Sequence, residues 1–353
     1  MFKIIGINPE MRKKDRLMNY SVSDHDFLED LDNWMFCVVG DVHPPNGFFV
    51  YPKYAPGNGP WKRGNLSFKR VIEKYSMIEL KKILDYFQEA KPDLVRFDDT
   101  LNVEMFFLPS TRIVKHYSCL QGLKNILEKD VKDNLERFLV DLVYELSDRS
   151  NVDLEYFGVT GSILLGIHHE KSDIDLVVYG RENYWRVINV LGEFTSPRYD
   201  RSLQRFATIY PISKSDAEKL ALRVKHKRRY REVDFSIYGV RRPGESNEKY
   251  GDKVYRMIGL AKARLKVIDS VDSCFTPSIY SVEGIAEIGS HRYIVEKLTC
   301  YDLTYTALFH EGDILEVYGK LEEVLDKKSN RRFYSILIGS FEAAGREYVK
   351  LLV

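Results

Sequence analysis

Residues 158–180, GVTGSILLGIHHEKSDIDLVVYG, constrain the fold of this chain more than any other stretch. Their pattern predicts a strand end, a tight turn at Gly161-Ser162, a short apolar helical segment, a polar loop and a second strand. Asp173 and Asp175 stand two residues apart at the start of that second strand, so the period of a strand places both side chains on one face of the sheet. Because two crowded carboxylates repel each other, this pattern indicates a bound divalent cation.

The Gly161-Ser162 turn adds a second chemical signal beside these carboxylates. Because the turn leads into a helix, its free backbone N–H groups point outward and favour an anion such as a phosphate. A third acidic residue, Asp234, lies in EVDFSIYGV at 232–240, where apolar and polar residues alternate. That alternation predicts a strand with Asp234 on its polar face. Metal-binding carboxylates beside a phosphate-binding turn indicate nucleotide chemistry.

The ordered set Gly161-Ser162, Asp173-x-Asp175 and Asp234 resembles the motif of the DNA polymerase beta-like nucleotidyltransferase superfamily. Within that superfamily the chain is most similar to the uncharacterised archaeal predicted nucleotidyltransferases. The motif covers about residues 158–240, and the segments VVGDVHPP, FVYPKYAP and YSILIGSFEAAGREYVKLL resemble the same archaeal group. The resemblance therefore extends beyond the motif, but it names no substrate.

The resemblance implies a role for each matching residue. Asp173 and Asp175 would bind two Mg²⁺ (or Mn²⁺) ions, and Asp234 would bind the second ion and help to accept the proton of an attacking hydroxyl. Gly161 and Ser162 would hold the β- and γ-phosphates of a nucleoside triphosphate (NTP). The implied reaction transfers a nucleoside monophosphate (NMP) from the NTP to an acceptor hydroxyl and releases pyrophosphate.

The sequence leaves the acceptor open. We expect an RNA 3′-hydroxyl, because basic residues flank the motif and the adjoining regions carry further basic patches. Two alternatives remain: transfer to a protein or a small molecule, and a nucleotide- or RNA-binding regulator without catalysis. Neither the NTP nor the oligomeric state can be predicted.

A basic run between Lys219 and Arg231 leads into the strand of Asp234. It predicts contact with the triphosphate or with an RNA backbone, and Arg223 and Lys225 are the residues we expect at the triphosphate. The alternative is a solvated helix end, the usual explanation of a charge run. Two other basic patches are candidate RNA contacts, each weighed against an ordinary solvated surface: Lys262, Arg264 and Lys266 with Tyr293, Tyr301 and Tyr305 as stacking partners, and Trp61, Lys62, Arg63, Lys69 and Arg70.

Hydrophobic periodicity predicts an α+β or α/β multidomain chain in which a mixed nucleotidyltransferase sheet is flanked by helices. We expect an N-terminal α/β cap domain at 1–129, a catalytic domain at 130–250 and a β-rich, barrel-like domain at 251–353 that is a candidate for nucleic-acid binding. The Gly- and Pro-rich segment 56–65 is predicted as a loop, and residues 215–230 are predicted as helical.

Composition bounds the partners and the compartment. The net charge of +1 provides no whole-molecule field for nucleic acid, so RNA binding would need a local patch. The four cysteines form no CxxC pair, which indicates a reducing cytoplasm. The N-terminus has no apolar stretch typical of a signal peptide, and the chain has no apolar run of membrane-spanning length, so we expect no membrane. The many charged residues and few glutamines are typical of a thermophile.

Overall fold

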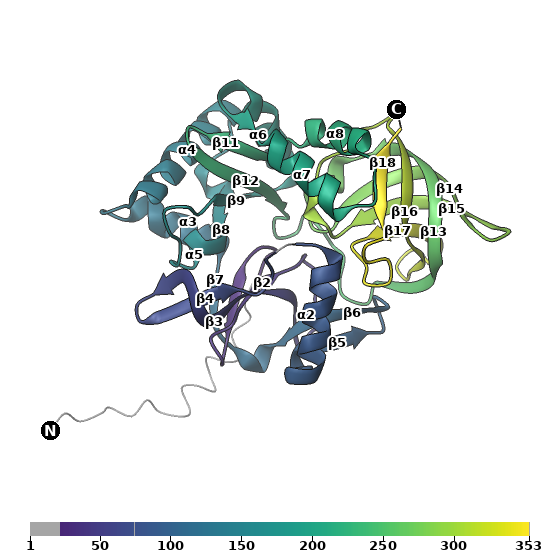
Figure 1. Ribbon diagram of the computed structural model, residues 1–353, viewed down its shortest axis with the longest axis horizontal. Coiled ribbons are helices and arrows are strands. Elements are labelled where there is room, and N and C mark those ends of the chain that lie inside the picture. The colour runs from purple at the N-terminus through teal and green to yellow at the C-terminus, as the bar shows by residue number, and fades with distance from the viewer. Residues whose placement is uncertain (1–21, 74, 353) are drawn as a thin grey trace.

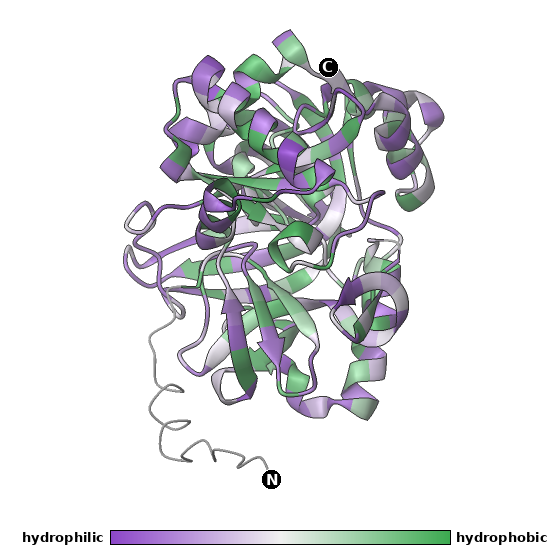
Figure 2. Cartoon of the chain, turned by 90° about the vertical axis from the view of Figure 1, so that its left-hand side faces the viewer, coloured by the Kyte–Doolittle hydropathy of each residue, from purple (hydrophilic) through white to green (hydrophobic). Residues whose placement is uncertain are grey.

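The computed structural model describes residues 22–73 and 75–352. These residues form three sheets that stand around a common centre, with most helices on the outside of the central sheet (Figure 1). Apolar residues gather on the strands and the inner sides of the helices, while polar residues face outward (Figure 2). The mixed α/β class expected from the sequence is confirmed. None of the described helices is long and apolar enough to span a membrane.

The N-terminal sheet has the order β5-β6-β3-β2-β1-β7, with β4 paired to β3. Its strands are β1 (Phe27–Asp30), β2 (Met35–Val38), β3 (Gly47–Arg63), β4 (Leu66–Arg70), β5 (Val95–Asp98), β6 (Val103–Pro109) and β7 (Ile113–Tyr117). The helix α2 (Met77–Ala90) covers it by burying Leu84 and Phe87, and it begins where the Ser76 hydroxyl accepts a hydrogen bond from the backbone N–H of Glu79.

The central sheet has the order β10-β11-β12-β9-β8 and is antiparallel except between β12 and β9. Its strands are β8 (Phe157–Thr160), β9 (Ile174–Tyr179), β10 (Ser196–Pro197), β11 (Lys227–Tyr230) and β12 (Val233–Val240). The helices of this region are α3 (Cys119–Glu128), α4 (Asn134–Ser150), α5 (Gly161–Leu164), α6 (Arg181–Phe194), α7 (Tyr199–Ile209) and α8 (Lys214–Arg223).

The period of two in β9 separates the two faces of the central sheet. Ile174 and Leu176 point into the apolar core formed with α4 and α6, where Leu139 and Val187 are fully buried. Asp175 therefore points to the opposite face. Because α4 and α6 cover only the apolar face, the polar face stays open toward the centre of the molecule.

The third sheet closes on itself. Its strands are β13 (Lys253–Asp269), β14 (Ser278–Ile288), β15 (His291–Cys300), β16 (Ile314–Asp326), β17 (Arg331–Ile338) and β18 (Tyr348–Leu351), in the order β13-β14-β15-β17-β16-β18. An additional pairing of β13 with β16 completes a ring, whose interior is filled by apolar side chains such as Leu265 and Ile336. Phe206 of α7 and Leu220 of α8 belong to the same apolar core, so these helices join the barrel to the central sheet.

Two local predictions are wrong. The segment 56–65 is largely strand, because β3 continues to Arg63 and pairs with β4 across a register shift between Pro56 and Trp61 that accommodates the prolines. The segment 215–230 is not one helix: α8 ends at Arg223 and the following residues form β11, which pairs with β12 across a tight turn. In both places strand pairing within a hairpin outweighed the preference predicted from local composition.

The buried amine of Lys320 links the barrel to the N-terminal region. It is fully buried, lies 3.1 Å from Glu322 and 2.9 Å from Glu342, and donates a hydrogen bond to the backbone carbonyl of Asn102. Burial raises the pKa of Glu322 to about 7, and Lys320 opposes this shift. Lys320 therefore neutralises the buried carboxylate of Glu322 and the partly exposed carboxylate of Glu342.

We predict that Lys320→Ala lowers the free energy of unfolding by about 3–5 kcal/mol, because it leaves the buried carboxylate of Glu322 without a counter-charge. Lys262→Ala in the same barrel is the matched control: Lys262 pairs with Glu316 at an exposed site, and its loss costs about 0–1 kcal/mol. Urea denaturation of both variants measures the difference. Equal stability of the two variants would contradict the structural role of Lys320.

Candidate active site

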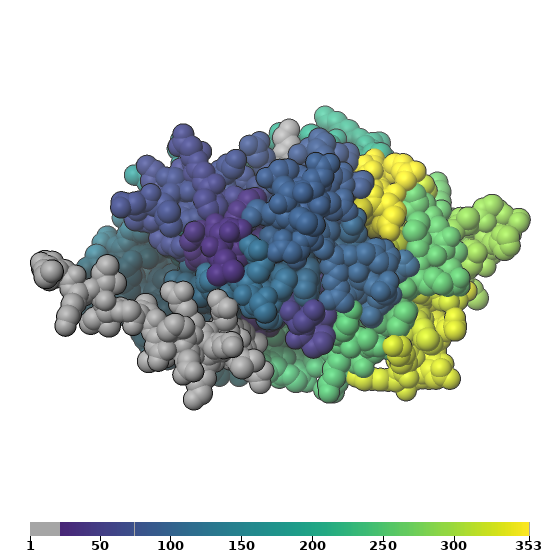
Figure 3. Space-filling view, turned by 90° about the horizontal axis from the view of Figure 1, so that it is seen from below, coloured from purple at the N-terminus to yellow at the C-terminus, as the bar shows by residue number. Residues whose placement is uncertain are grey.

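A cavity of about 370 Å³ lies where the three sheets meet. All three contribute to its wall: Lys53 and Tyr51 from the N-terminal sheet, Asp175 and Ser236 from the central sheet, and Tyr301 from the barrel region. Seen from below, the N-terminal region covers the front of the molecule and meets the barrel (Figure 3). The polar face of the central sheet is therefore enclosed by the other two sheets.

The register of the central sheet aligns four polar residues across its strands. Thr160 of β8 is opposite Asp175 of β9, Asp175 is opposite Ser236 of β12, and Ser236 is opposite Lys227 of β11. Asp175, Ser236 and Lys227 all line the central cavity. The carboxylate of β9 thus lies between the turn that follows β8 and the basic strand β11.

Asp173 and Asp234 are joined by two guanidinium groups. Arg198 lies 3.3 Å from the Oδ2 of Asp173 through Nη2 and 3.3 Å from the Oδ2 of Asp234 through Nε. Arg201 Nη1 lies 3.0 Å from the same oxygen of Asp234 and 3.7 Å from that of Asp173. Arg229 Nε donates to the other oxygen of Asp234 at 2.7 Å. The two carboxylates therefore face the same small volume.

The two carboxyls respond differently to this environment. Burial raises the pKa of Asp173, an effect that Arg198 opposes and the charge of Asp175 reinforces. Burial also raises the pKa of Asp234, but its hydrogen bond with Arg229 and the charges of Arg198 and Arg201 outweigh burial and leave that pKa below its usual value. The surrounding cations therefore hold Asp234 ionised. At Asp173 the nearby cations do not outweigh burial and the charge of Asp175, so its pKa stays raised.

This set of donors fits a divalent cation. Asp173, Asp175 and Asp234 supply hard carboxylate oxygens, the ligands that Mg²⁺ and Mn²⁺ prefer. Asp173 and Asp234 repel each other unless positive charge lies between them. The guanidinium groups of Arg198 and Arg201 supply that charge here. A metal ion at this place would replace Arg198 and Arg201 as the neutralising charge.

Backbone conformation explains the glycine of the turn. Gly161 has a φ of +70°, which L side chains rarely adopt, and a Cβ at this position would lie 2.7 Å from Asp175 Oδ2. Ser162 follows it and lines the cavity with Asp173 and Asp175. Thr160 Oγ1 donates to the His25 carbonyl at 2.7 Å, so the end of β8 is anchored to the N-terminal region. The turn is thereby held beside the Asp175 carboxylate.

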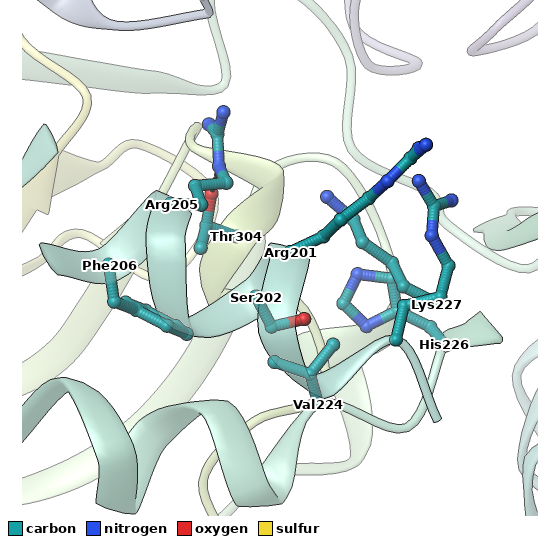
Figure 4. A pocket seen from close by; sticks show the side chains of 9 residues that line it. Arg201, Ser202, Arg205, Phe206, Val224, His226, Lys227 and Thr304 are labelled. Atoms are coloured by element: carbon teal, nitrogen blue, oxygen red, sulfur yellow. Dashed lines mark hydrogen bonds between the residues drawn. The ribbon is translucent and has the colours of Figure 1, made fainter. Parts of the chain in front are cut away.

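Sequence reasoning missed the arginines of α7. Arg198, Arg201 and Arg205 follow the spacing i, i+3, i+7 in SPRYDRSLQRF, which places them on one face of a helix. All three line a second cavity of about 160 Å³, which shares Arg198, Arg205 and Lys227 with the central cavity (Figure 4). The helical spacing predicts that the three arginines share one face. It does not predict what that face contacts, because this depends on where α7 packs.

The structure places Arg223 and Lys225 elsewhere. Arg223, at the end of α8, forms an ion pair with Asp313 of the barrel, and the exposed Lys225 lies near His310. Neither residue lines the central cavity or the second cavity. Among the residues expected at the site, the structure brings together Asp173, Asp175, Asp234, Gly161 and Ser162, while Arg223 and Lys225 lie apart from them.

Several residues of the other two basic patches have partners within the protein. On the barrel, Lys262 pairs with Glu316 at 2.9 Å and Lys266 lies 3.8 Å from Glu283. Tyr305 is fully buried in the barrel core, so it is not available to stack on a base. In the N-terminal region Arg63 pairs with Glu29, and Arg70 lies 5.0 Å above the ring of Trp61. These contacts reduce the charge available to a nucleic-acid backbone.

A separate cluster also has the composition of a metal site. One ligand atom each of Asp133, Glu136 and His168 lies within 4.8 Å of the others. Asp133 and Glu136 form the capping box of α4, and Lys129 neutralises Glu136 at 2.7 Å. Helix capping and this ion pair account for the cluster without a metal ion.

Comparison with known proteins agrees with the motif. Residues 141–238 match the model of the nucleotidyltransferase domain family, a range that contains the turn and all three aspartates. The chain is 28% identical over 351 residues to "Uncharacterized protein MJ1086" of Methanocaldococcus jannaschii, with 92% of this chain and 98% of that protein covered. No solved structure matches the chain. The resemblance to nucleotidyltransferases and to an archaeal protein is confirmed.

We predict that Gly161→Ala weakens Mn²⁺ binding by about tenfold or more, because the new methyl group displaces the Asp175 carboxylate. Gly166→Ala is the matched control: its φ of +64° imposes the same backbone strain, about 1–2 kcal/mol, but nothing lies within 4 Å of its Cβ. Calorimetric titration with Mn²⁺ and thermal unfolding separate the two effects. Equal loss of Mn²⁺ affinity in both variants would show that strain alone is responsible.

We predict that the Lys227 amine titrates near pH 8, well below other lysines. Burial and the charges of Arg205 and Arg198 lower the pKa of Lys227 to about 8, although Asp302 and Asp175 oppose them. Carbon-13 NMR of reductively methylated lysines measures the midpoint, and the Lys227→Arg variant identifies the signal. A midpoint above that of an ordinary lysine would mean that negative charge surrounds the amine instead.

Proposed function

We propose that this chain, which carries a nucleotidyltransferase domain, transfers an NMP from an NTP to an acceptor hydroxyl in a Mg²⁺-dependent reaction. The observation that carries the proposal is the convergence of Asp173, Asp175 and Asp234 on one face of a sheet beside the Gly161-Ser162 turn. Acidic ligands next to an anion-binding turn are what the chemistry of a metal-bound triphosphate requires.

Each residue has a role in the proposed reaction. Asp173, Asp175 and Asp234 would hold the Mg²⁺ (or Mn²⁺) ions, which when bound neutralise phosphate charge and lower the pKa of the attacking hydroxyl. The acceptor oxygen bonds to the α-phosphorus, the bond from that phosphorus to the β-phosphate oxygen breaks, and pyrophosphate leaves. Asp234 accepts the hydroxyl proton, and the Gly161-Ser162 turn holds the β- and γ-phosphates.

Two cations of the N-terminal sheet are better placed for the triphosphate than Arg223 and Lys225. Lys53 of β3 and Arg70 of β4 both line the central cavity, and both interact electrostatically with Asp175. They therefore lie over the part of the site that contains the Gly161-Ser162 turn. In this proposal they complete the phosphate contacts from the sheet that covers the cavity.

The acceptor expected from the sequence was an RNA 3′-hydroxyl. A small-molecule acceptor is favoured by the enclosure of the site between three sheets and by the pairing of Lys262 and Lys266 with acidic neighbours. The two are distinguished by incubating the protein with Mg²⁺, labelled NTPs and either RNA pools or the low-molecular-weight fraction of a lysate. An RNase-insensitive small product supports the small-molecule acceptor, whereas labelled RNA supports the RNA 3′-hydroxyl.

The division into a cap at 1–129, a catalytic part at 130–250 and a barrel-like part at 251–353 stays a prediction, which the three separate sheets support. Residues of the N-terminal part and of the barrel-like part line the central cavity together with those of the central sheet. All three would therefore contribute to substrate binding, with the chemistry confined to the central sheet.

We predict that Asp173→Asn and Asp234→Asn each lower the rate of pyrophosphate release by roughly 10²–10³-fold or more, because each removes charge that the transition state requires. Asp148→Asn, at an exposed position of α4, is the control and keeps the parental rate. Chelation by EDTA removes activity, and added Mg²⁺ restores it.

A parental rate in Asp173→Asn would contradict the proposed chemistry. Tight NTP binding without pyrophosphate release from any acceptor pool would instead identify the chain as a nucleotide-binding regulator. Both outcomes are read from the same coupled assay for pyrophosphate together with equilibrium binding of the nucleotide.

A further inference from the structure

The second cavity lies on the opposite side of the carboxylates from the Gly161-Ser162 turn. In the sheet order β11-β12-β9-β8, the turn follows β8 at one end and Lys227 begins β11 near the other. Three strand spacings of ~4.8 Å separate the backbones of Thr160 and Lys227, about 14 Å in all. The aspartates therefore lie between a triphosphate held at the turn and the second cavity.

The wall of the second cavity is strongly basic. Arg198, Arg201, Arg205 and Lys227 all line it. Arg205 is neutralised by Asp302 at 3.1 Å, but in the described part of the chain no carboxylate oxygen lies within 4 Å of the Lys227 amine. Burial is the main cause of the lowered pKa of Lys227, and the charges of Arg205 and Arg198 lower it further. The cavity has more positive charge than the protein neutralises.

Buried polar groups without partners line the same cavity. His226 is 1% exposed, and neither of its ring nitrogens has a hydrogen-bond partner. Burial and the charge of Lys227 lower the pKa of His226 to about 3, so the ring is neutral and has one N–H to donate. Ser202 lies beside it, as Figure 4 shows. An unpaired buried N–H of His226 next to the unneutralised amine of Lys227 indicates a site for an anion.

The shape of the cavity limits the kind of anion. Phe206 and Val224 supply its apolar wall, and both belong to the closed core between α7, α8 and the barrel. The cavity adjoins the central cavity, because Arg198, Arg205 and Lys227 line both. A volume of about 160 Å³ accepts a terminal phosphate monoester more readily than a phosphodiester that is flanked by nucleotides on both sides.

Metal binding would increase the positive charge of this cavity. Arg198 and Arg201 now neutralise Asp173 and Asp234, and the Arg201 side chain is 60% exposed and so free to turn. Once a divalent cation occupies the carboxylates, both guanidinium groups lose these partners. They remain on the wall of the cavity, where an anion would be their new partner.

We propose that the second cavity binds a terminal phosphate monoester of the acceptor, so that the acceptor is a small hydroxyl compound carrying a phosphate group. The inference rests on the proposed function, because the acceptor must approach the α-phosphorus from the side opposite the leaving pyrophosphate. The cavity lies on that side, next to Asp234. The acceptor hydroxyl bonds to the α-phosphorus, its proton passes to Asp234, and pyrophosphate leaves toward the Gly161-Ser162 turn; the acceptor phosphate is unchanged.

The first experiment measures binding of inorganic phosphate to the full chain by calorimetry, without nucleotide and in the presence of Mg²⁺. We expect Lys227→Met and Arg201→Gln each to weaken phosphate binding by about tenfold or more. Lys214→Met, at an exposed site on α8, is the matched control and should leave the affinity within about twofold. Thermal unfolding of each variant verifies that it is folded.

The second experiment separates this cavity from the triphosphate site. The four NTPs are tested in turn with Mg²⁺, and the tightest-binding one is titrated into the same variants and into Ser162→Ala. We expect Ser162→Ala to weaken nucleotide binding and leave phosphate binding unchanged, and Lys227→Met to show the reverse. In transfer reactions with the small-molecule fraction, inorganic phosphate should inhibit by competing with the acceptor and not with the NTP.

Three results would overturn the inference: no phosphate binding by the parent protein, equal loss of phosphate and nucleotide binding in Lys227→Met, or transfer to RNA that phosphate does not inhibit. Absence of pyrophosphate release with every acceptor would contradict the proposed function instead. The phosphate titration needs no catalysis, so the two failures are distinguishable.

Discussion

The mutual repulsion of Asp173, Asp175 and Asp234 is the constraint on which the rest of the structure depends. Three carboxylates on one sheet face can remain ionised only if positive charge is brought to them from elsewhere in the chain. The structure supplies it from α7 through Arg198 and Arg201, and from β11 through Arg229. The position of α7 is therefore an electrostatic requirement of the site as well as a matter of packing.

The barrel secures that position. α7 and α8 bury apolar side chains in the barrel core, and the ion pair between Arg205 and Asp302 ties the basic face of α7 to the barrel. On the other side, Thr160 is hydrogen-bonded to the N-terminal region, which covers the cavity. The central sheet thus turns its acidic face toward a cavity between the three sheets, where electrostatic interactions are stronger than in open water, while Asp173 stays partly exposed.

Much of the central sheet could be predicted because its information is local. The alternation in β9 and β12 placed Asp175 and Asp234 on polar faces, and the Gly161 turn follows from a conformation that glycine alone adopts easily. The arginines of α7 were overlooked and the end of α8 was misjudged for one reason. A charged segment has the same composition whether it is solvated or packed against carboxylates, and a few residues of sequence do not distinguish the two.

By itself, the sequence determined the Gly161-Ser162 turn and the strands that carry the three aspartates, because each of these pieces is encoded within a few consecutive residues. The same stretch matches the nucleotidyltransferase domain family. The tertiary structure decided which cations meet those acids: Arg198 and Arg201, and not Arg223 or Lys225. The physical reason is that ion pairs form between groups brought within a few ångströms. Only the packing of α7 against the barrel determines which groups those are.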